Sequence, residues 1–216
     1  LKARKDTRKK IKTETDNFKK SVLDGLQLAY KITANSLYGQ IGAKTSPIFL
    51  KDIAASTTAT GRRLLHLAKD KVQIHMPGTD IVYGDTDSIF VNFNPKDEEG
   101  NKLYGKEALK KTIELGERFE NEFCQYLKKP HHLEYEKTFW PFILLSKKRY
   151  VGNKYEFDVN KYKRTSMGIV LKRRDNAEIV KYVYGGIIDI FMNINNKDPI
   201  NQSIEFLRKS LNDLVD

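Results

Sequence analysis

Two aspartates stand two positions apart in the stretch IVYGDTDSIF, residues 81–90. The β-branched and aromatic residues on both sides predict two short strands, and the segment from Gly84 to Asp87 predicts the turn between them. Carboxylate oxygens are ligands that Mg²⁺ prefers, and two-metal phosphoryl transfer needs carboxylates that hold both ions. Turn aspartates also often bond to their own backbone. Within this stretch alone, Asp85 and Asp87 stay open to two interpretations, a plain turn and a metal site.

A second set of polar residues shares one face of a predicted helix. Lys31 and Asn35 are four positions apart and Tyr38 follows three later, which offers a charge for phosphate, an amide and a flat ring on one stripe. Arg4 and Arg8 are also four apart, on the preceding predicted helix. In an antiparallel helical hairpin these cations would converge, and arginine forks match the oxygens of a triphosphate. Solvated helix residues remain the alternative for the two arginines.

Positive charge is concentrated in two stretches of the chain. The 216 residues carry 39 Lys and Arg against 28 Asp and Glu, a formal net charge of +11, which favours a polyanionic partner. One basic stretch opens the chain, and another runs from KKRY at 147–150 to KRRD at 172–175. A solvated face explains either stretch alone equally well. Two such stretches together with an acidic turn favour nucleic acid.

Composition excludes several other classes of protein. A mean hydropathy of −0.58 with 31% charged residues is typical of a folded chain whose surface faces water. No apolar run approaches the roughly 20 residues that span a bilayer, so we expect no membrane partner. Cys124 is the single cysteine, which excludes an internal disulfide framework and a cysteine zinc site built from this chain alone.

The elements that must position these residues follow from periodicity and turn residues. Helices are predicted over 1–14, 24–40, 51–73, 106–128, 175–195 and 202–215. Strands are predicted for the hairpin at 81–93 and within 132–152, 154–159 and 165–171. This order predicts an α+β fold in three unequal regions, namely a helical hairpin, an antiparallel sheet with packed helices, and a helical end.

Five segments, in order, resemble motifs of the B-family DNA polymerases, closest to the delta-like branch that includes many large DNA viruses. LKARKDTR resembles the arginine-bearing fingers helix, KITANSLYG the Lys-x-x-x-Asn-Ser-x-Tyr-Gly motif, and YGDTDS the metal motif of the palm. KKRY resembles the primer-template motif, and GIVLKRRDN the junction of palm and thumb. The resemblance implies a right-hand polymerase fragment with fingers over 1–41, palm over 42–172 and the start of the thumb over 173–216.

The resemblance also implies the reaction and its nucleotide contacts. A primer 3′-hydroxyl would be extended from deoxynucleoside triphosphates under direction of a template. Lys31 would contact the triphosphate of the incoming nucleotide, with Arg4 and Arg8 adding charge from the opposite helix. Asn35 would lie beside the nucleotide, and Tyr38 would pack under the nascent base pair.

Metal and DNA contacts are implied in the same way. Asp87 would be a direct ligand of two Mg²⁺ ions, and Asp85 would lie near them as a less direct ligand; with Lys31 they form the expected catalytic set. Contacts to primer-template DNA are implied for Lys147, Lys148, Arg149, Tyr150, Arg173 and Arg174. In the full-length enzyme a sliding clamp is a further expected partner, and the expected location is intracellular, in the nucleus or a viral replication compartment.

One family motif is missing from the chain. The other metal carboxylate belongs to a motif resembling Asp-x-x-Ser-Leu-Tyr-Pro-Ser, and no such string occurs in residues 1–216. We therefore expect a fragment whose second carboxylate ligand lies outside the chain and which is inactive in isolation. Glu134 and Glu136 are the other acids in a predicted strand near the site, either as ligands of an additional ion or as surface acids.

Two alternatives come from other functional classes. A metal-dependent glycosyltransferase also uses an Asp-x-Asp triplet, but it leaves the basic strands and the Lys31 stripe unexplained. A DNA-binding polymerase fragment without catalysis is the second alternative. Binding of primer-template DNA discriminates against the first, and primer extension by the full-length protein discriminates against the second.

Overall fold

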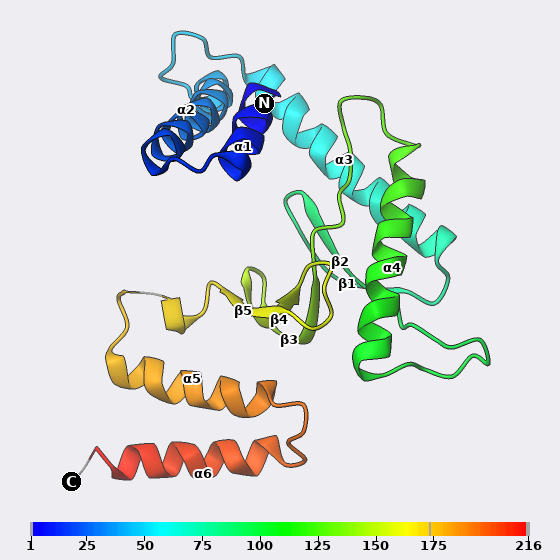
Figure 1. Cartoon of the computed structure of the whole chain (residues 1–216), viewed down its shortest axis with the longest axis vertical. Coiled ribbons are helices and arrows are strands. Elements are labelled where there is room, and N and C mark those ends of the chain that lie inside the picture. The colour runs from blue at the N-terminus through cyan, green and yellow to red at the C-terminus, as the bar shows by residue number, and fades with distance from the viewer. Residues whose placement is uncertain (1, 173, 215–216) are drawn as a thin grey trace. The chain divides into compact units, whose positions relative to one another are not determined.

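A computed structural model describes residues 2–172 and 174–214 of the chain (Figure 1). Its backbone divides into two compact units, Leu1–Leu64 and Leu65–Asp216. Among the described residues there are six α-helices, one short 3₁₀-helix and five strands in two antiparallel sheets. The predicted α+β class is therefore confirmed.

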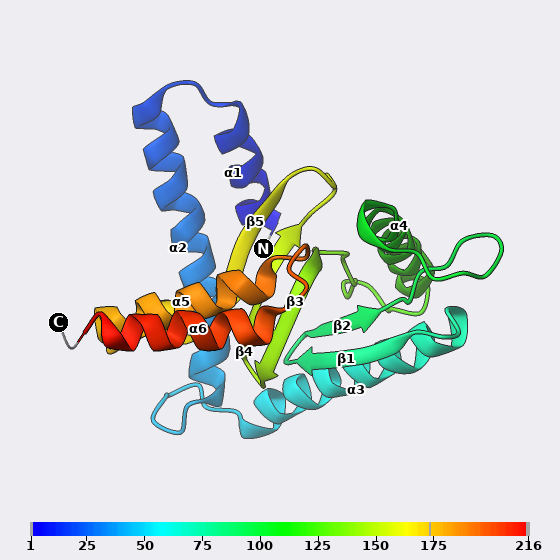
Figure 2. The ribbon, with the colours of Figure 1, turned by 90° about the horizontal axis from the view of Figure 1, so that it is seen from below.

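The first unit is built on a helical hairpin. Helix α1 (Lys2–Thr13) and helix α2 (Asn17–Gly42) are joined by three residues and run antiparallel, as Figure 2 shows. The Asp16 carboxylate caps α2 by accepting from the backbone N–H groups of Phe18 at 2.8 Å and Lys19 at 3.2 Å. Because of this cap, α2 begins at Asn17, and the predicted start at residue 24 was too late. Helix α3 (Lys51–His75) then leads out of this unit into the second.

Two small antiparallel sheets form the centre of the second unit. Strand β1 (Asp80–Asp85) pairs with β2 (Ser88–Asn92) in a hairpin whose last pair is Asp85 with Ser88, which confirms the predicted hairpin. The other sheet has the order β3 (Thr138–Ser146), β4 (Arg149–Tyr155) and β5 (Tyr162–Met167). The β3–β4 connection is Lys147-Lys148, so the KKRY segment is a turn followed by the start of a strand.

Three predicted strand segments were wrong. Residues 132–137 have no regular structure, because the N–H of Tyr135 donates to Glu120 Oε2 at 2.6 Å instead of to a neighbouring strand. Residues 156–159 form the turn that follows β4, since Tyr155 already pairs with Tyr162 of β5. Strand β5 ends at Met167 because Gly168 has a φ of +60°, and a short 3₁₀-helix (Val170–Lys172) follows.

Buried side chains on both sides of the sheets hold the second unit together. The C-terminal half of α3 packs Ala68 and Val72 against Phe119 and Phe123 of helix α4 (Gly105–Cys124). A second cluster joins β4 and helix α5 (Glu178–Met192) through Val151, Ile169, Ile188 and Met192.

An aromatic cluster joins the two sheets to each other. The ring of Phe90 on β2 lies 5.3 Å from that of Tyr83, 5.6 Å from Phe142 and 5.5 Å from Tyr150. A Cβ atom at Gly152 would lie 2.7 Å from the Phe139 ring, so glycine lets that ring approach the β4 backbone. The cluster fixes the β1–β2 hairpin against β3 and β4, and so brings their two turns together.

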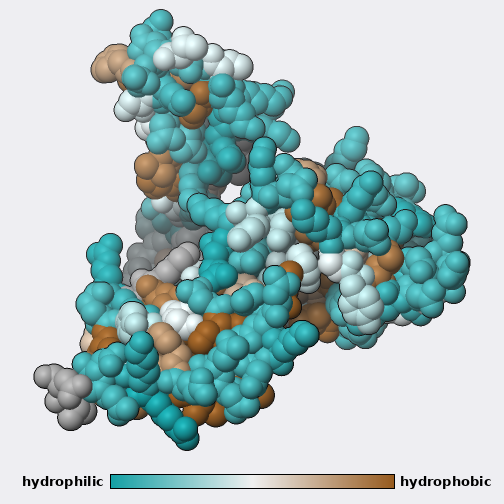
Figure 3. Space-filling model, turned by 60° about the horizontal axis from the view of Figure 1, so that its bottom comes forward, coloured by the Kyte–Doolittle hydropathy of each residue, from teal (hydrophilic) through white to brown (hydrophobic). Residues whose placement is uncertain are grey.

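Helix α5 and helix α6 (Pro199–Asn212) close the chain as a helical pair that lies side by side in Figures 1 and 2. Apolar side chains remain exposed on this pair, among them Tyr182, Ile200 and Leu211, and Figure 3 shows brown residues among teal ones over it. Among the helices of the described residues, none is long and apolar enough to cross a membrane.

Candidate functional site

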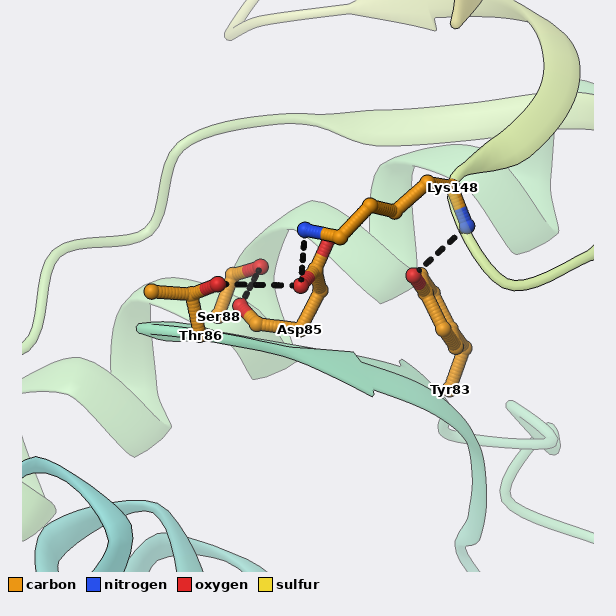
Figure 4. Close-up of polar contacts among 5 residues, drawn as sticks. All are labelled: Tyr83, Asp85, Thr86, Ser88 and Lys148. Atoms are coloured by element: carbon orange, nitrogen blue, oxygen red, sulfur yellow. Dashed lines mark hydrogen bonds and ion pairs between the residues drawn. The ribbon is translucent and has the colours of Figure 1, made fainter. Parts of the chain in front are cut away.

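The acidic turn between β1 and β2 is closed by its own backbone and hydroxyl groups (Figure 4). Thr86 has a φ of 54°, and the N–H of Asp87 donates to the carbonyl oxygen of Asp85 at 2.6 Å. The hydroxyl of Thr86 donates to Asp85 Oδ1 at 3.0 Å, and that of Ser88 to the Asp85 carbonyl at 3.2 Å. A threonine in the left-handed region stores strain of about 1–3 kcal/mol, which the surrounding contacts must hold.

Lys148 reaches this turn from the other sheet. Its ammonium donates to both carboxylate oxygens of Asp85, at 2.7 Å and 2.9 Å, and its backbone N–H donates to the Tyr83 hydroxyl at 2.9 Å. Figure 4 shows Lys148 above the turn with both contacts. The sequence prediction placed Lys148 on DNA and Asp85 near the metals, but did not anticipate that they form an ion pair. Tyr83 was missed altogether, since its sequence signal is only that of a strand residue.

The ion pair shifts both of its members toward their charged forms. The hydrogen bond from Lys148, and after it that from Thr86, lowers the pKa of Asp85 from its ordinary value of 3.8. The hydrogen bond to Asp85 in turn raises the pKa of Lys148 above 10.5. Asp85 is therefore an anion, and Lys148 a cation, throughout the neutral range.

Asp87 stands in a different environment from Asp85. Its side chain is exposed, and no polar partner of its carboxylate is found among the described residues. Two carboxylates on one turn offer hard oxygen donors that suit Mg²⁺, and Asp87 is the one whose oxygens are free. Nowhere in the described part of the chain do three or more His, Cys, Asp or Glu gather as a metal site. The residues present therefore fit part of a magnesium site rather than a whole one.

Glu134 and Glu136 lie in the irregular segment before β3 and not on a strand. Glu134 Oε1 is 3.0 Å from His132 Nε2, and Glu136 Oε2 is 2.9 Å from Lys137 Nζ. Both are exposed, so each is a surface acid paired with a close neighbour in sequence. The alternative of an additional ion bound by either glutamate is not tested by these contacts.

The helical hairpin places two of the residues predicted for a nucleotide, Arg4 and Arg8, against α2. Arg4 Nε donates to Gln27 Oε1 at 3.2 Å, and Gln27 Nε2 donates to Asp24 Oδ1 at 3.1 Å. Arg4 and Arg8 line a depression of about 360 Å³ together with these two α2 residues. Gln27 is four positions before Lys31, so the arginines face the stripe of α2 that carries Lys31 one turn further on.

The other residues of that stripe are open to solvent. Lys31 and Asn35 are exposed on α2, and the Tyr38 side chain keeps 44% of its surface accessible. No residue of α2 is buried among the described residues. Arg4 and Arg8 thus lie beside Asp24 and Gln27, one turn before Lys31, and their convergence with the stripe on one ligand stays a prediction.

The residues predicted to contact DNA fall into two kinds. Lys147 and Arg149 are exposed on either side of Lys148, and Arg174 is exposed after the 3₁₀-helix. Tyr150 is instead only 8% exposed within the aromatic cluster, and burial raises the pKa of its hydroxyl. The Tyr150 side chain therefore packs in the interior next to the β3–β4 turn and has little surface exposed for contact with DNA. Arg173 lies outside the described residues.

Comparison with known proteins gives one consistent result. The sequence model of the family described as DNA polymerase family B matches residues 1–216 of this chain. A DNA polymerase of Pyramimonas orientalis virus is 62% identical over 200 residues, which cover 93% of this chain and 16% of the relative. The DNA polymerase delta catalytic subunit of Schizosaccharomyces pombe is 36% identical over 226 residues, covering 100% of this chain and 19% of the relative. A DNA polymerase of Acanthamoeba polyphaga mimivirus is 42% identical over 176 residues, covering 80% and 10% respectively.

Proposed function

The chain belongs to DNA polymerase family B, as its five ordered segments predicted, and from this premise we propose that it supplies part of the polymerising site of a template-directed DNA polymerase. The chain spans between 10% and 19% of the length of the three relatives described above, so the proposed activity is that of the full-length protein. In that reaction the primer 3′-oxygen attacks the α-phosphorus of a deoxynucleoside triphosphate, and pyrophosphate leaves.

The three regions of a right-hand polymerase are part of this proposal. The α1–α2 hairpin would belong to the fingers over residues 1–41, the two sheets with α3 and α4 to the palm over 42–172, and the α5–α6 pair to the thumb from 173 onward. The order of helical hairpin, antiparallel sheets and helical pair supports this assignment. The division into compact units at Leu64 falls within α3 and does not coincide with the proposed boundary at 41.

The observation that carries the proposal is the difference between the two aspartates of the turn. The Asp87 carboxylate has no partner among the described residues, while Asp85 is neutralised by Lys148 at 2.7 Å. Asp87 would hold Mg²⁺ together with a second carboxylate from outside the chain, and Asp85 would support it. Bound there, two Mg²⁺ ions would activate the attacking oxygen and stabilise the leaving group.

The helical hairpin would bind the incoming nucleotide. Arg4 is held by Gln27 on the same side of the hairpin as Lys31, which supports a joint role in binding a triphosphate. Asn35 and Tyr38 continue the stripe toward the nascent base pair. A side chain that is already positioned loses less conformational entropy when the ligand binds, so Arg4 would bind phosphate more favourably than a free arginine.

Primer-template DNA would be held at the β3–β4 turn. Lys147, Lys148 and Arg149 would contact the backbone near the growing end, with Arg173 and Arg174 following at the base of the thumb. A sliding clamp as a further partner, and an intracellular location in the nucleus or a viral replication compartment, belong to the same proposal. The viral relatives support the second of these locations.

Substitution of Asp87→Asn in the full-length protein tests the proposal. Mutation of a residue that only hydrogen-bonds to a metal ligand typically lowers metal affinity or activity by about 10- to 100-fold. For a direct ligand we therefore expect the rate of primer extension to fall by at least about 100-fold, while DNA binding is retained. Asp70→Asn, at an exposed position of α3, is the matched control and should leave the rate unchanged. A near-normal rate for Asp87→Asn with Mg²⁺ would reject the metal role, and a wild-type protein that binds DNA without extending it would favour the non-catalytic alternative.

A further inference from the structure

The β3–β4 turn is held from two sides by residues of other elements. Lys148 has a φ of 61°, an unfavourable conformation for a residue with a Cβ atom, so something must hold it there. On one side its N–H donates to the Tyr83 hydroxyl at 2.9 Å. On the other side its carbonyl oxygen packs against Gly168. The backbone of Lys148 is thus hydrogen-bonded on one side and in close contact on the other with distant parts of the chain.

Two features of Gly168 favour glycine over residues that carry a Cβ atom. Its φ is +60°, and a Cβ atom built on it would lie 2.2 Å from the carbonyl oxygen of Lys148. The obstacle is backbone, which cannot rotate away as the end of a side chain can. The next residue, Ile169, is 1% exposed in the cluster with Val151 and Ile188, so Gly168 itself has little room to retreat.

Tyr83 is held equally firmly. Its ring lies 5.3 Å from that of Phe90, which belongs to the aromatic cluster between the two sheets. The position of the Tyr83 hydroxyl is therefore set by the hairpin that also carries Asp85. Because the Lys148 ammonium is attached to its backbone by a flexible aliphatic side chain, fixing that backbone limits where the ammonium can reach.

We propose that Gly168 and Tyr83 are positioning residues that hold the Lys148 turn in place, so that the Lys148 ammonium stays on Asp85. Neither residue touches a substrate in this scheme; both act through Lys148. The consequence for DNA synthesis rests on the proposed function, in which Lys148 also contacts the primer-template. The consequence for the turn itself does not.

A double-mutant cycle in the full-length protein tests whether Gly168 acts through Lys148. A displacement of about 1 Å in a positioned group can cost on the order of 100-fold in rate, so Gly168→Ala should lower kcat/KM for primer extension by that order. Lys148→Met alone should also lower kcat/KM. Introduced into the Gly168→Ala variant, Lys148→Met should lower kcat/KM by no more than about a further twofold, because the effects of coupled residues are not additive. Fully additive effects would overturn the proposal.

Gly105→Ala is the matched control for backbone strain. Gly105 has a φ of +65°, close to that of Gly168, but a Cβ atom there would meet nothing within 4 Å. It carries the cost of the positive φ without the clash, so kcat/KM should stay within about twofold of wild type. An equal loss of activity in both glycine variants would show that strain alone, and not contact with Lys148, explains the effect.

Tyr83→Phe provides a second test that needs no polymerase activity and no tolerance of a new methyl group. The change keeps the ring and removes the hydrogen bond, so amide hydrogen exchange at Lys148 should accelerate by about fivefold, the equivalent of one lost hydrogen bond. Tyr135→Phe is the control, since its hydroxyl bonds Thr138 and the Glu156 carbonyl. It should leave exchange at Lys148 unchanged. Unaltered exchange in Tyr83→Phe would overturn the proposal, whereas normal activity of Asp87→Asn would count against the proposed function alone.

Discussion

At the scale of single residues, the two aspartates of one turn are given different chemistry by their neighbours. Asp85 is only 28% exposed and is held by Lys148, whereas Asp87 is exposed and unpartnered within the described chain. An anion that already has a cation in contact is a weaker ligand for a second cation. The arrangement therefore supports the division of roles that we propose, with Asp87 as the direct ligand and Asp85 as its support.

The ion pair makes a prediction about pH. Because the pKa of Asp85 is lowered below 3.8 by Lys148, the pair contributes stability that is present above pH 3.8 and is lost as pH falls through the lowered pKa. The free energy of unfolding of wild type minus that of Lys148→Met should therefore be larger at pH 6 than at pH 3, as measured by urea unfolding. Because the pKa of Lys148 is raised above 10.5, its ammonium stays charged up to that pH, and the contribution of the ion pair to stability should be lost only at higher pH.

Lys147→Met is the control for the pH prediction. Lys147 is the neighbouring exposed lysine, and no partner of its ammonium is found among the described residues. Its substitution removes the same charge without removing the ion pair, so its effect on stability should be nearly the same at pH 3 and pH 6. If Lys148→Met also shows no pH dependence, the pair does not persist in solution.

The sequence predicted these residues better than it predicted their contacts. The turn with Asp85 and Asp87 followed from local pattern, and so did the exposed lysines beside it. The pairing of Lys148 with Asp85 joins positions 63 apart, and its bond to Tyr83 joins positions 65 apart. No local periodicity encodes such contacts, because they depend on how two sheets pack through Phe90.

At the scale of elements, one error in prediction arose where a side chain took over a backbone hydrogen bond. The alternation of HLEYEK is typical of a strand, yet Glu120 accepts the N–H of Tyr135, and the Tyr135 ring packs on Gly116 of α4. A Cβ atom at Gly116 would lie 2.6 Å from that ring. This segment therefore lies on a helix instead of pairing with a strand, which alternation alone could not reveal.

The cap of α2 can be tested at the same scale. Asp16→Ala removes the acceptor of two N–H groups, so it should destabilise the first turn of α2 by about 1 kcal/mol. Amide exchange at Phe18 and Lys19 should accelerate, while nucleotide use should stay normal because Lys31 lies several turns further along. Asp6→Ala, an exposed position on α1, is the control. Unchanged exchange at Phe18 and Lys19 would mean that the cap contributes nothing.

The packing of α5 on α6 provides another element-scale prediction. A Cβ atom at Gly186 would lie 2.3 Å from the Phe206 ring, so Gly186→Ala should overpack this contact and destabilise the pair by about 1–3 kcal/mol. At Gly61 of α3 nothing lies within 4 Å, and Gly61→Ala should instead stabilise its helix by up to about 1 kcal/mol. Urea unfolding measures the change in the free energy of unfolding for both variants. A change of the same sign in both would contradict the packing of Phe206 on Gly186.

At the scale of the whole molecule, family membership and charge were both readable from the sequence, whereas the division into compact units was not. The net charge of +11 favoured a polyanionic partner, and the five ordered segments identified family B, with which the comparisons agree. The break at Leu64 falls inside a continuous helix, so no loop or turn marks it in the sequence. Long helices carry no local mark of where the surrounding contacts end.

The positive charge at the β3–β4 turn should show itself in the salt dependence of DNA binding. If Lys147 contacts a phosphate of primer-template DNA, binding releases counterions, and Lys147→Met should reduce the slope of log Kd against log salt by about 0.9. The loss should be uniform across template sequences, because phosphate contacts do not read bases. Anisotropy of a labelled primer-template over a range of salt concentrations measures it in the full-length protein. Lys111→Met on α4, where Lys111 pairs with Glu114 at 3.7 Å, is the control and should leave the slope unchanged. Equal slopes for wild type and Lys147→Met would remove Lys147 from the DNA interface, while a change in both variants would mean that net charge acts without a defined binding face.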